Sequence, residues 1–289
     1  MYLKYLFFLS CFCFFIANTL QAQEASTSPC FICKGHSHSL TKVPYRAFSV
    51  KKEAPFMATA IGLSAAAYFL PEPSPFTVSD LNLLDANSIN NFDRSAINNS
   101  SATAKKASDV FLLGVLVLPA VFLSNHSTRD DIIPLGALSV EVVLLNYAFT
   151  AIVKKIAKRT RPLAYNSAFP IEDKLDANVR ASFYSGHTSH TAALSFFMAK
   201  VMTDYHPSAG KGFKIGVWTF AASVPAITGY LRVRAGKHFP TDTIVGGIAG
   251  GLVGVLVPHL HRKKQAKVAQ KVKFNGSIGI GMATINMQF

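Results

Sequence analysis

Residues 231–260 read LRVRAGKHFPTDTIVGGIAGGLVGVLVPHL, a charged stretch that runs directly into an apolar one. The apolar run Thr243–Leu260 predicts a helix. Ahead of it, His238 and Asp242 stand four residues apart, so one helical turn brings the carboxylate to the imidazole. A turn at Gly236 can bring Arg232 close to His238 and Asp242. This stretch predicts a polar site at the end of an apolar helix.

Apolar blocks recur along the rest of the chain. Half of its 289 residues are apolar and only 15% are charged, which favours a membrane protein or a very helical one. Six blocks predict six helices: Pro55–Leu70, Val110–Leu123, Ile132–Val153, His190–Met202, Phe213–Leu231 and Thr243–Leu260. Several are shorter than the roughly 20 residues of a perpendicular span. The expected fold class is all-α, a bundle of about six apolar, membrane-embedded helices.

The first residues resemble a secretory signal peptide. Lys4 precedes an apolar run, and cleavage is expected after Ala22. An uncleaved anchor helix is the alternative. The expected domains are a signal peptide (1–22), a polar N-terminal segment (23–54), a helical domain (55–260, with its motif core at 132–260), and a basic segment with a β-hairpin (261–289).

Two smaller patterns lie near the ends of the chain. Asn275-Gly276 suits a tight turn and has alternating apolar residues on either side, which predicts a short C-terminal β-hairpin. Near the N-terminus, Cys30 and Cys33 precede His36 and His38 in a pattern that resembles a small zinc site. A local disulfide or an inert pair of thiols is the favoured interpretation.

The formal net charge of +14 raises the question of nucleic-acid binding. Such binding needs a basic patch with aromatics or a known module around it, and the sequence has neither. Its cations instead occupy the loops between the apolar blocks, as expected for contact with anionic lipid head groups or phosphates. We therefore expect the membrane, and no nucleic acid, as a partner.

Two further clusters point to an anion site. Lys154 and Arg161 are seven residues apart, which is two helical turns and places them on one face. Ser185 and Gly186 precede a predicted helix, where small residues leave backbone amides free to bind an anion. Glu141 lies inside an apolar block and is costly there unless it is paired.

Together the clusters resemble the signature of the type-2 phosphatidic acid phosphatase and vanadium haloperoxidase superfamily. That signature is Lys, six residues, Arg-Pro; then Pro-Ser-Gly-His; then Ser-Arg, five residues, His, three residues, Asp. The chain matches it with Lys154, Arg161-Pro162, Ser185-Gly186-His187, Arg232, His238 and Asp242. It departs at Tyr184, in place of Pro, and at Leu231, in place of Ser. The resemblance covers about Ile132 to Leu260.

The resemblance implies a role for each matched residue. His238 would attack phosphorus and form a phosphohistidine, Asp242 would orient it, and His187 would protonate the leaving oxygen. His190 is expected to be a bystander. No cofactor and no catalytic metal are implied. The residues implied to bind the substrate phosphate are Lys154, Arg161, Ser185, Gly186 and Arg232.

The expected activity is a phosphatase that acts on a lipid phosphate or pyrophosphate, placed in the membrane of a bacterial cell envelope with its site facing the periplasm. Three alternatives use the same residues. A soluble periplasmic acid phosphatase has the same motifs in a helical core. A haloperoxidase would hold vanadate where the phosphatase holds phosphate. A non-catalytic membrane protein would use the clusters to bind lipid head groups. Protein partners are not indicated by the sequence.

Overall fold

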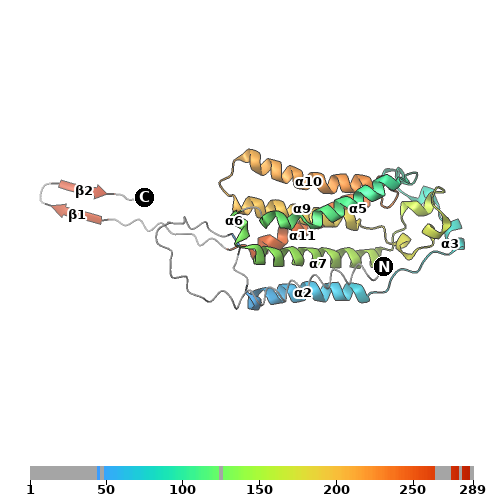
Figure 1. Cartoon of the computed structure of the whole chain (residues 1–289), viewed down its shortest axis with the longest axis horizontal. Coiled ribbons are helices and arrows are strands. Elements are labelled where there is room, and N and C mark those ends of the chain that lie inside the picture. Colours follow the sequence, from blue (N-terminus) through green and yellow to red (C-terminus); the bar gives the residue numbers. More distant parts are fainter. Residues whose placement is uncertain (1–43, 46–48, 124–125, 264–274, 280–281, 287–289) are drawn as a thin grey trace.

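The computed structural model describes residues 44–45, 49–123, 126–263, 275–279 and 282–286. The predicted signal peptide, most of the polar N-terminal segment and the two cysteines lie outside these residues. Figure 1 shows the long helices lying side by side as a bundle. They are α2 (Val50–Phe69), α5 (Ala102–Leu116), α7 (Ile132–Ala157), α9 (Gly186–Tyr205), α10 (Lys211–Arg234) and α11 (Pro240–His261), and each contains or overlaps one predicted apolar block.

Short helical elements cluster at one end of the bundle, on the right in Figure 1. They belong to the segments 71–101 and 158–185, whereas α6 (His126–Arg129) lies at the other end of the bundle, on the left in Figure 1, in contact with η3 (Leu118–Leu123). At the right-hand end α7 and α10 finish and α9 and α11 begin. The remaining short elements are α3 (Val78–Asn82), η2 (Ala86–Ser88), α4 (Asn91–Arg94), η4 (Pro162–Tyr165), α8 (Ile171–Lys174) and η5 (Ala177–Arg180).

Helix α9 is the centre of the bundle. It packs against α5, α7, α10 and α11, and its side chains Leu194 and Phe197 are buried in the main core cluster. Phe197 packs edge-to-face on Phe122, with ring centroids 5.9 Å apart. Hydroxyl groups on α9 are paired inside the bundle, as where Ser195 Oγ donates to the Ala221 carbonyl oxygen at 2.8 Å. Polar side chains on this helix are therefore compatible with burial.

The contact between α9 and α11 depends on three glycines spaced four residues apart, Gly246, Gly250 and Gly254. A methyl group at Gly250 would lie 2.0 Å from the Ser189 carbonyl oxygen, and one at Gly254 would lie 2.2 Å from the Ala193 carbonyl oxygen. Small residues at this spacing let two helix backbones approach closely. Any side chain here would force the two helices apart.

Three helical segments are long and apolar enough to cross a membrane, and the prediction of about six embedded helices is corrected to this number for the described part of the chain. They are Ala102–Leu123, Ile132–Tyr165 and Pro240–His261. The sequence overestimated the number because polar residues interrupt the apolar character of α9 and α10, such as Ser195 and Lys200 in α9 and Lys214 in α10. Along α11 a row of aliphatic side chains is exposed, as suits a helix in contact with lipid: Ile244, Ile248, Leu252, Leu256 and Leu260.

The prediction of a C-terminal β-hairpin as part of the fold is wrong. Up to residue 263, the described chain is helical and contains no strand. Two short segments, β1 (Asn275–Gly279) and β2 (Met282–Asn286), pair with Asn275 opposite Asn286, so the predicted turn Asn275-Gly276 is not a turn. They stand clear of the helices in Figure 1. A two-stranded ladder without a packing face is marginally stable in water, which is why local alternation was a poor guide here.

We predict that Gly250→Ala destabilises the protein, because its methyl group would meet the α9 backbone. Overpacking of this kind costs about 1–3 kcal/mol. Gly251→Ala is the matched control, since a methyl group there would lie 3.7 Å from the Phe196 ring, an ordinary contact. Thermal unfolding in detergent should show a lower transition temperature for Gly250→Ala alone. Equal transition temperatures for the two variants would contradict this account of the helix contact.

Candidate active site

The structure brings the predicted site residues together at the end of the bundle where the short helices gather. Lys154 lies in the last turn of α7, and Arg161 directly precedes η4. Ser185 is the N-cap of α9, with Gly186 and His187 in its first turn. Arg232 lies in the last turn of α10 and Asp242 in the first turn of α11, with His238 between these two helices.

The turn that carries His238 requires a glycine. Gly236 has a φ of 66°, a conformation that other residues rarely adopt. A methyl group at Gly236 would also lie 2.1 Å from the Asn99 carbonyl oxygen. This tight turn brings His238 back beside the end of α10, as its spacing from Arg232 predicted.

Backbone carbonyl groups hold two of the cations in place. Lys154 Nζ donates to the Ala181 oxygen at 2.6 Å, and Arg161 Nε donates to the Asn178 oxygen at 2.8 Å. Arg232 is buried, and its Nε has no hydrogen-bond partner among the described residues. Because these contacts leave much of the positive charge uncompensated, the three side chains form a site suited to an anion.

The first turn of α9 joins this cationic group. Ser185 Oγ lies 3.0 Å from Thr188 Oγ1, and the Ser185 amide donates to the Asp242 carbonyl oxygen at 3.0 Å. A methyl group at Gly186 would lie 3.8 Å from Lys154 Cε, which shows how near the helix terminus is to that cation. The N-terminus of α9 thus adds partial positive charge and amide donors to the same anion site.

His238 is oriented by a backbone carbonyl group. Its Nδ1 lies 2.8 Å from the Ser182 carbonyl oxygen, which can only accept, so Nδ1 carries the hydrogen. In the neutral ring, Nε2 then has a free lone pair. Asp242 Oδ2 is 3.7 Å from His238 Nδ1, so the carboxylate acts on the ring less directly than the sequence suggested.

Asp242 is fully buried and holds several groups in place. It accepts from Ser182 Oγ at 2.6 Å and from the Phe239 amide at 2.9 Å. Arg159 NH1 donates to its other oxygen at 2.5 Å, and Arg159 NH2 donates to the buried Asp93 at 2.7 Å. A buried carboxylate is tolerated only with such partners. Asp242 therefore positions Ser182, which in turn positions His238.

Sequence reasoning missed Asp109 on α5. Asp109 Oδ1 lies 2.8 Å from His187 Nε2 and 3.5 Å from Arg232 NH1. Because a carboxylate only accepts, His187 Nε2 carries a hydrogen in this contact. Nothing local distinguished Asp109 from the other polar residues of its region, so only the fold could reveal this contact.

Arg159, Asp93 and Ser182 were also missed. Arg159 belongs to a run of cations that resembles an ordinary membrane-surface cluster, and Asp93 lies in a long polar segment. Their contacts with each other and with Asp242 span large sequence separations. His190, the expected bystander, has its Nδ1 2.8 Å from the Gly186 carbonyl oxygen of its own helix.

Of the two departures from the signature, Tyr184 can be placed clearly. Its side chain is buried, and its hydroxyl accepts from Thr150 Oγ1 on α7 at 3.3 Å. Tyr184 thus packs between helices, and its hydroxyl bonds to α7.

Both histidines favour the neutral form in this site. Burial, followed by the charges of Arg161, Lys154 and Arg232, holds the pKa of His238 well below its usual range. Burial, followed by the charge of Arg232, lowers the pKa of His187 to about 4, while Asp109 opposes that shift. An anion that binds beside them would raise both pKa values.

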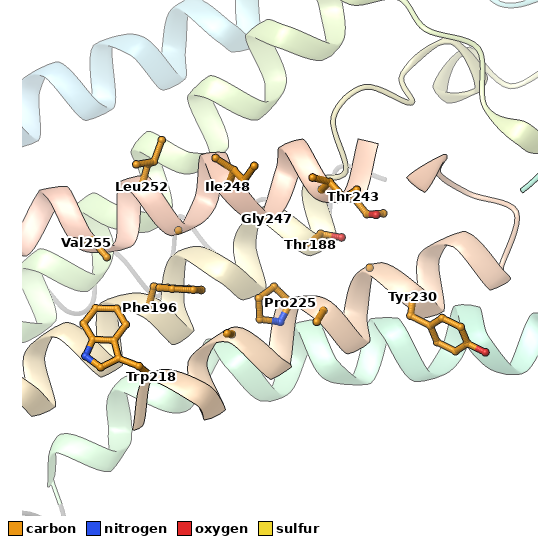
Figure 2. A pocket seen from close by; sticks show the side chains of 15 residues that line it. Thr188, Phe196, Trp218, Pro225, Tyr230, Thr243, Gly247, Ile248, Leu252 and Val255 are labelled. Carbon is orange, nitrogen blue, oxygen red and sulfur yellow. The ribbon is translucent and has the colours of Figure 1, made fainter. Parts of the chain in front are cut away.

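An apolar pocket of about 680 Å³ lies beside the site, between α9, α10 and α11. Thr188 and Thr243, which follow His187 and Asp242 in the sequence, contribute to its lining. Figure 2 shows these two threonines on one side of the pocket, with Phe196 and Trp218 farther along it. The rest of the lining is mainly aliphatic and small residues, so the pocket suits a hydrocarbon group.

Part of the chain is similar to known proteins. Residues 136–266, which include the site residues from Lys154 to Asp242, match the family model of the PAP2 superfamily. Phosphatidylglycerophosphatase B of Bacillus subtilis (strain 168) is 26% identical over 147 residues, which are 51% of this chain and 65% of that protein. The chain thus matches slightly less than two thirds of this relative's length.

A solved structure is also similar. It is described as the crystal structure of the first transmembrane PAP2 type phosphatidylglycerolphosphate phosphatase from Bacillus subtilis. The alignment has a TM-score of 0.44 and 20% identity, and it covers 72% of this chain and 95% of that one. The match of residues 136–266 to the PAP2 superfamily model agrees with the family resemblance that the sequence motifs indicated.

Proposed function

We propose that this protein is a phosphatase that hydrolyses a lipid phosphate or pyrophosphate through a phosphohistidine, without a catalytic metal. The observation that carries the proposal is the free Nε2 of His238 beside three cations and an apolar pocket. The relative named phosphatidylglycerophosphatase B supports the same class of reaction.

In the first step, the lone pair of His238 Nε2 attacks phosphorus and the bond from phosphorus to the ester oxygen breaks. His187 gives a proton to that leaving oxygen. Burial and Arg232 lower the pKa of His187, and the incoming phosphate dianion raises it so that the ring carries the required proton. The Ser182 carbonyl group, supported by Asp242, stabilises the positive charge that develops on the His238 ring.

In the second step, water attacks the phosphorus of the phosphohistidine. His187, now without its proton, accepts one from that water, the bond from nitrogen to phosphorus breaks, and inorganic phosphate leaves. Lys154, Arg161 and Arg232 hold the phosphate oxygens in both steps, with the amides at the start of α9. Fixed charges of this kind are worth most in the transition state, where negative charge on the oxygens is redistributed.

The apolar pocket favours a lipid substrate. It begins next to the phosphate-binding turn of α9 and continues between α10 and α11, whose outer faces carry exposed aliphatic side chains. A hydrocarbon chain can therefore remain in apolar surroundings while its phosphate reaches His238. A soluble acid phosphatase would have no use for such a pocket, and a haloperoxidase would need no hydrocarbon site.

We further propose that the site faces the periplasm. The end of the bundle opposite the site carries cations that favour the cytoplasmic side: Lys51, Arg129, Lys211, Lys214, Arg262 and Lys263.

The activity can be tested with full-length protein in detergent, supplied with a panel of lipid phosphates and a soluble ester in the presence of EDTA. We expect lipid phosphates to be the preferred substrates and His238→Ala to reduce phosphate release by roughly 10⁴-fold or more. His190→Gln is the control and should retain most activity. Preference for the soluble ester would favour the acid phosphatase, and vanadate-dependent halide oxidation would favour the haloperoxidase.

Asp109→Asn should change the pH dependence of the reaction. Asp109 raises the pKa of His187, so its removal lowers the pKa of the acid, and the loss of activity at high pH should begin at a lower pH. At neutral pH we expect a loss of about tenfold or more. Profiles of kcat/KM against pH measure the shift, with the exposed Asp130→Asn as the control. A uniform loss at every pH would show that Asp109 does not act on the proton of His187.

The lipid pocket can be tested by filling it. A methyl group at Gly247 would lie 3.7 Å from Thr188 Cγ2, so a leucine there projects into the pocket. Gly247→Leu should lower kcat/KM about tenfold or more for a long-chain lipid phosphate, since the displaced chain loses its apolar contacts, and leave a soluble ester unaffected. Gly216→Leu on the exposed face of α10 is the control. Equal losses on both substrates would mean that the pocket does not hold the lipid chain.

A further inference from the structure

At the end of the bundle opposite the active site, side chains from three helices meet. They are Glu53 near the start of α2, Glu141 in α7 and His261 at the end of α11. His261 Nε2 lies 2.9 Å from Glu53 Oε2 and 3.5 Å from Glu141 Oε2. The side chains of Glu141 and His261 are only 6% and 5% exposed, and that of Glu53 is 15% exposed. This cluster is about 20 Å along α7 from Lys154, since a helix rises about 1.5 Å per residue.

The orientation of His261 makes the cluster unusual. Its Nδ1 lies 2.9 Å from the Val257 carbonyl oxygen, which accepts, so Nδ1 carries the hydrogen of the neutral ring. Nε2 then directs its lone pair toward two carboxylates, which also offer only lone pairs. Despite its proximity to Glu53, Nε2 has no hydrogen-bond partner among the described residues. Three electron-pair donors that face one another require a positive charge between them.

The structure has space for such a charge. A cavity of about 10 Å³ lies against Glu53, Glu141 and His261 and is otherwise lined mostly by apolar side chains. This volume is about what one bound water molecule requires, so a single small ion fits. In the part of the chain that the structure describes, the ion pairs of the two glutamates involve His261 and no lysine or arginine. Two carboxylates in a buried, largely apolar setting are costly without a counter-charge.

We propose that Glu53, Glu141 and His261 bind a divalent transition-metal ion such as Zn²⁺. An imidazole nitrogen with two carboxylate oxygens suits such an ion better than Mg²⁺ or Ca²⁺, which prefer oxygen ligands throughout. The hydrogen bond from His261 Nδ1 to a backbone carbonyl is the contact that usually orients a metal-binding histidine. The ion would neutralise the carboxylates and tie α2 to α7 and α11. It is a structural site and takes no part in the reaction at His238.

The test uses full-length protein in detergent with Cys30→Ser and Cys33→Ser, so that these thiols bind no metal. The protein is stripped with a chelator and titrated with Zn²⁺ or Co²⁺. Bound metal is measured by mass spectrometry, Co²⁺ coordination by its visible absorption, and stability by thermal unfolding. We expect about one ion per chain and a rise of several degrees in the unfolding temperature on Zn²⁺ binding.

Glu53→Gln and His261→Gln should each lose the bound ion, the Co²⁺ absorption and the rise in unfolding temperature. His259→Gln, an exposed histidine two residues from His261, is the matched control and should retain all three. Glu53→Gln keeps the test decisive if His261→Gln does not fold, because Glu53 lies at the edge of the bundle. The proposal is wrong if the parent binds no ion, or if Glu53→Gln binds Zn²⁺ as tightly as the parent. Phosphate release is also measured with metal-stripped protein that is still folded. Activity in that protein would show that the proposed reaction does not depend on the proposed metal site, so the two proposals can fail independently.

Discussion

The close contact between α9 and α11 is the constraint on which the rest of the site depends. The glycines of α11 let its backbone lie against that of α9, and nothing larger fits at Gly250. Through this contact the Ser185 amide reaches the Asp242 carbonyl oxygen. The cluster at Ser185 and the cluster at Asp242 are far apart in the sequence. They form one site because the backbones of α9 and α11 are in contact.

Electrostatics then prepares this site for an anion. Backbone carbonyl groups hold Lys154 and Arg161, Arg232 lies near Asp109, and Arg159 balances the buried Asp242. Burial and these cations lower the pKa values of His187 and His238 and so favour their neutral forms. The proposed reaction uses this arrangement directly, since a neutral His238 can attack, and the phosphate itself promotes protonation of His187.

Much of the helical fold and the residues of the site were predictable, because they depend on local pattern. Apolar runs gave the long helices, and the spacing of Arg232, His238 and Asp242 indicated the polar turn before α11. The partners Asp93, Asp109 and Arg159 were not predictable, since their contacts join segments far apart in the chain. The hairpin prediction failed because alternation in a short segment says little when no surface packs against it.

The central claim is that His238 carries the phosphoryl group during the reaction. It can be tested by supplying a lipid phosphate with a radiolabelled phosphate group, quenching the reaction and looking for label on the protein. His187→Ala removes the proposed proton donor. With a substrate that has a good leaving group, this change should slow hydrolysis of the phosphohistidine more than its formation, so that the intermediate accumulates. The account predicts a label that is stable in base, labile in acid and located on His238 by mass spectrometry. A label on another residue, or none under conditions where phosphate is released, would contradict it.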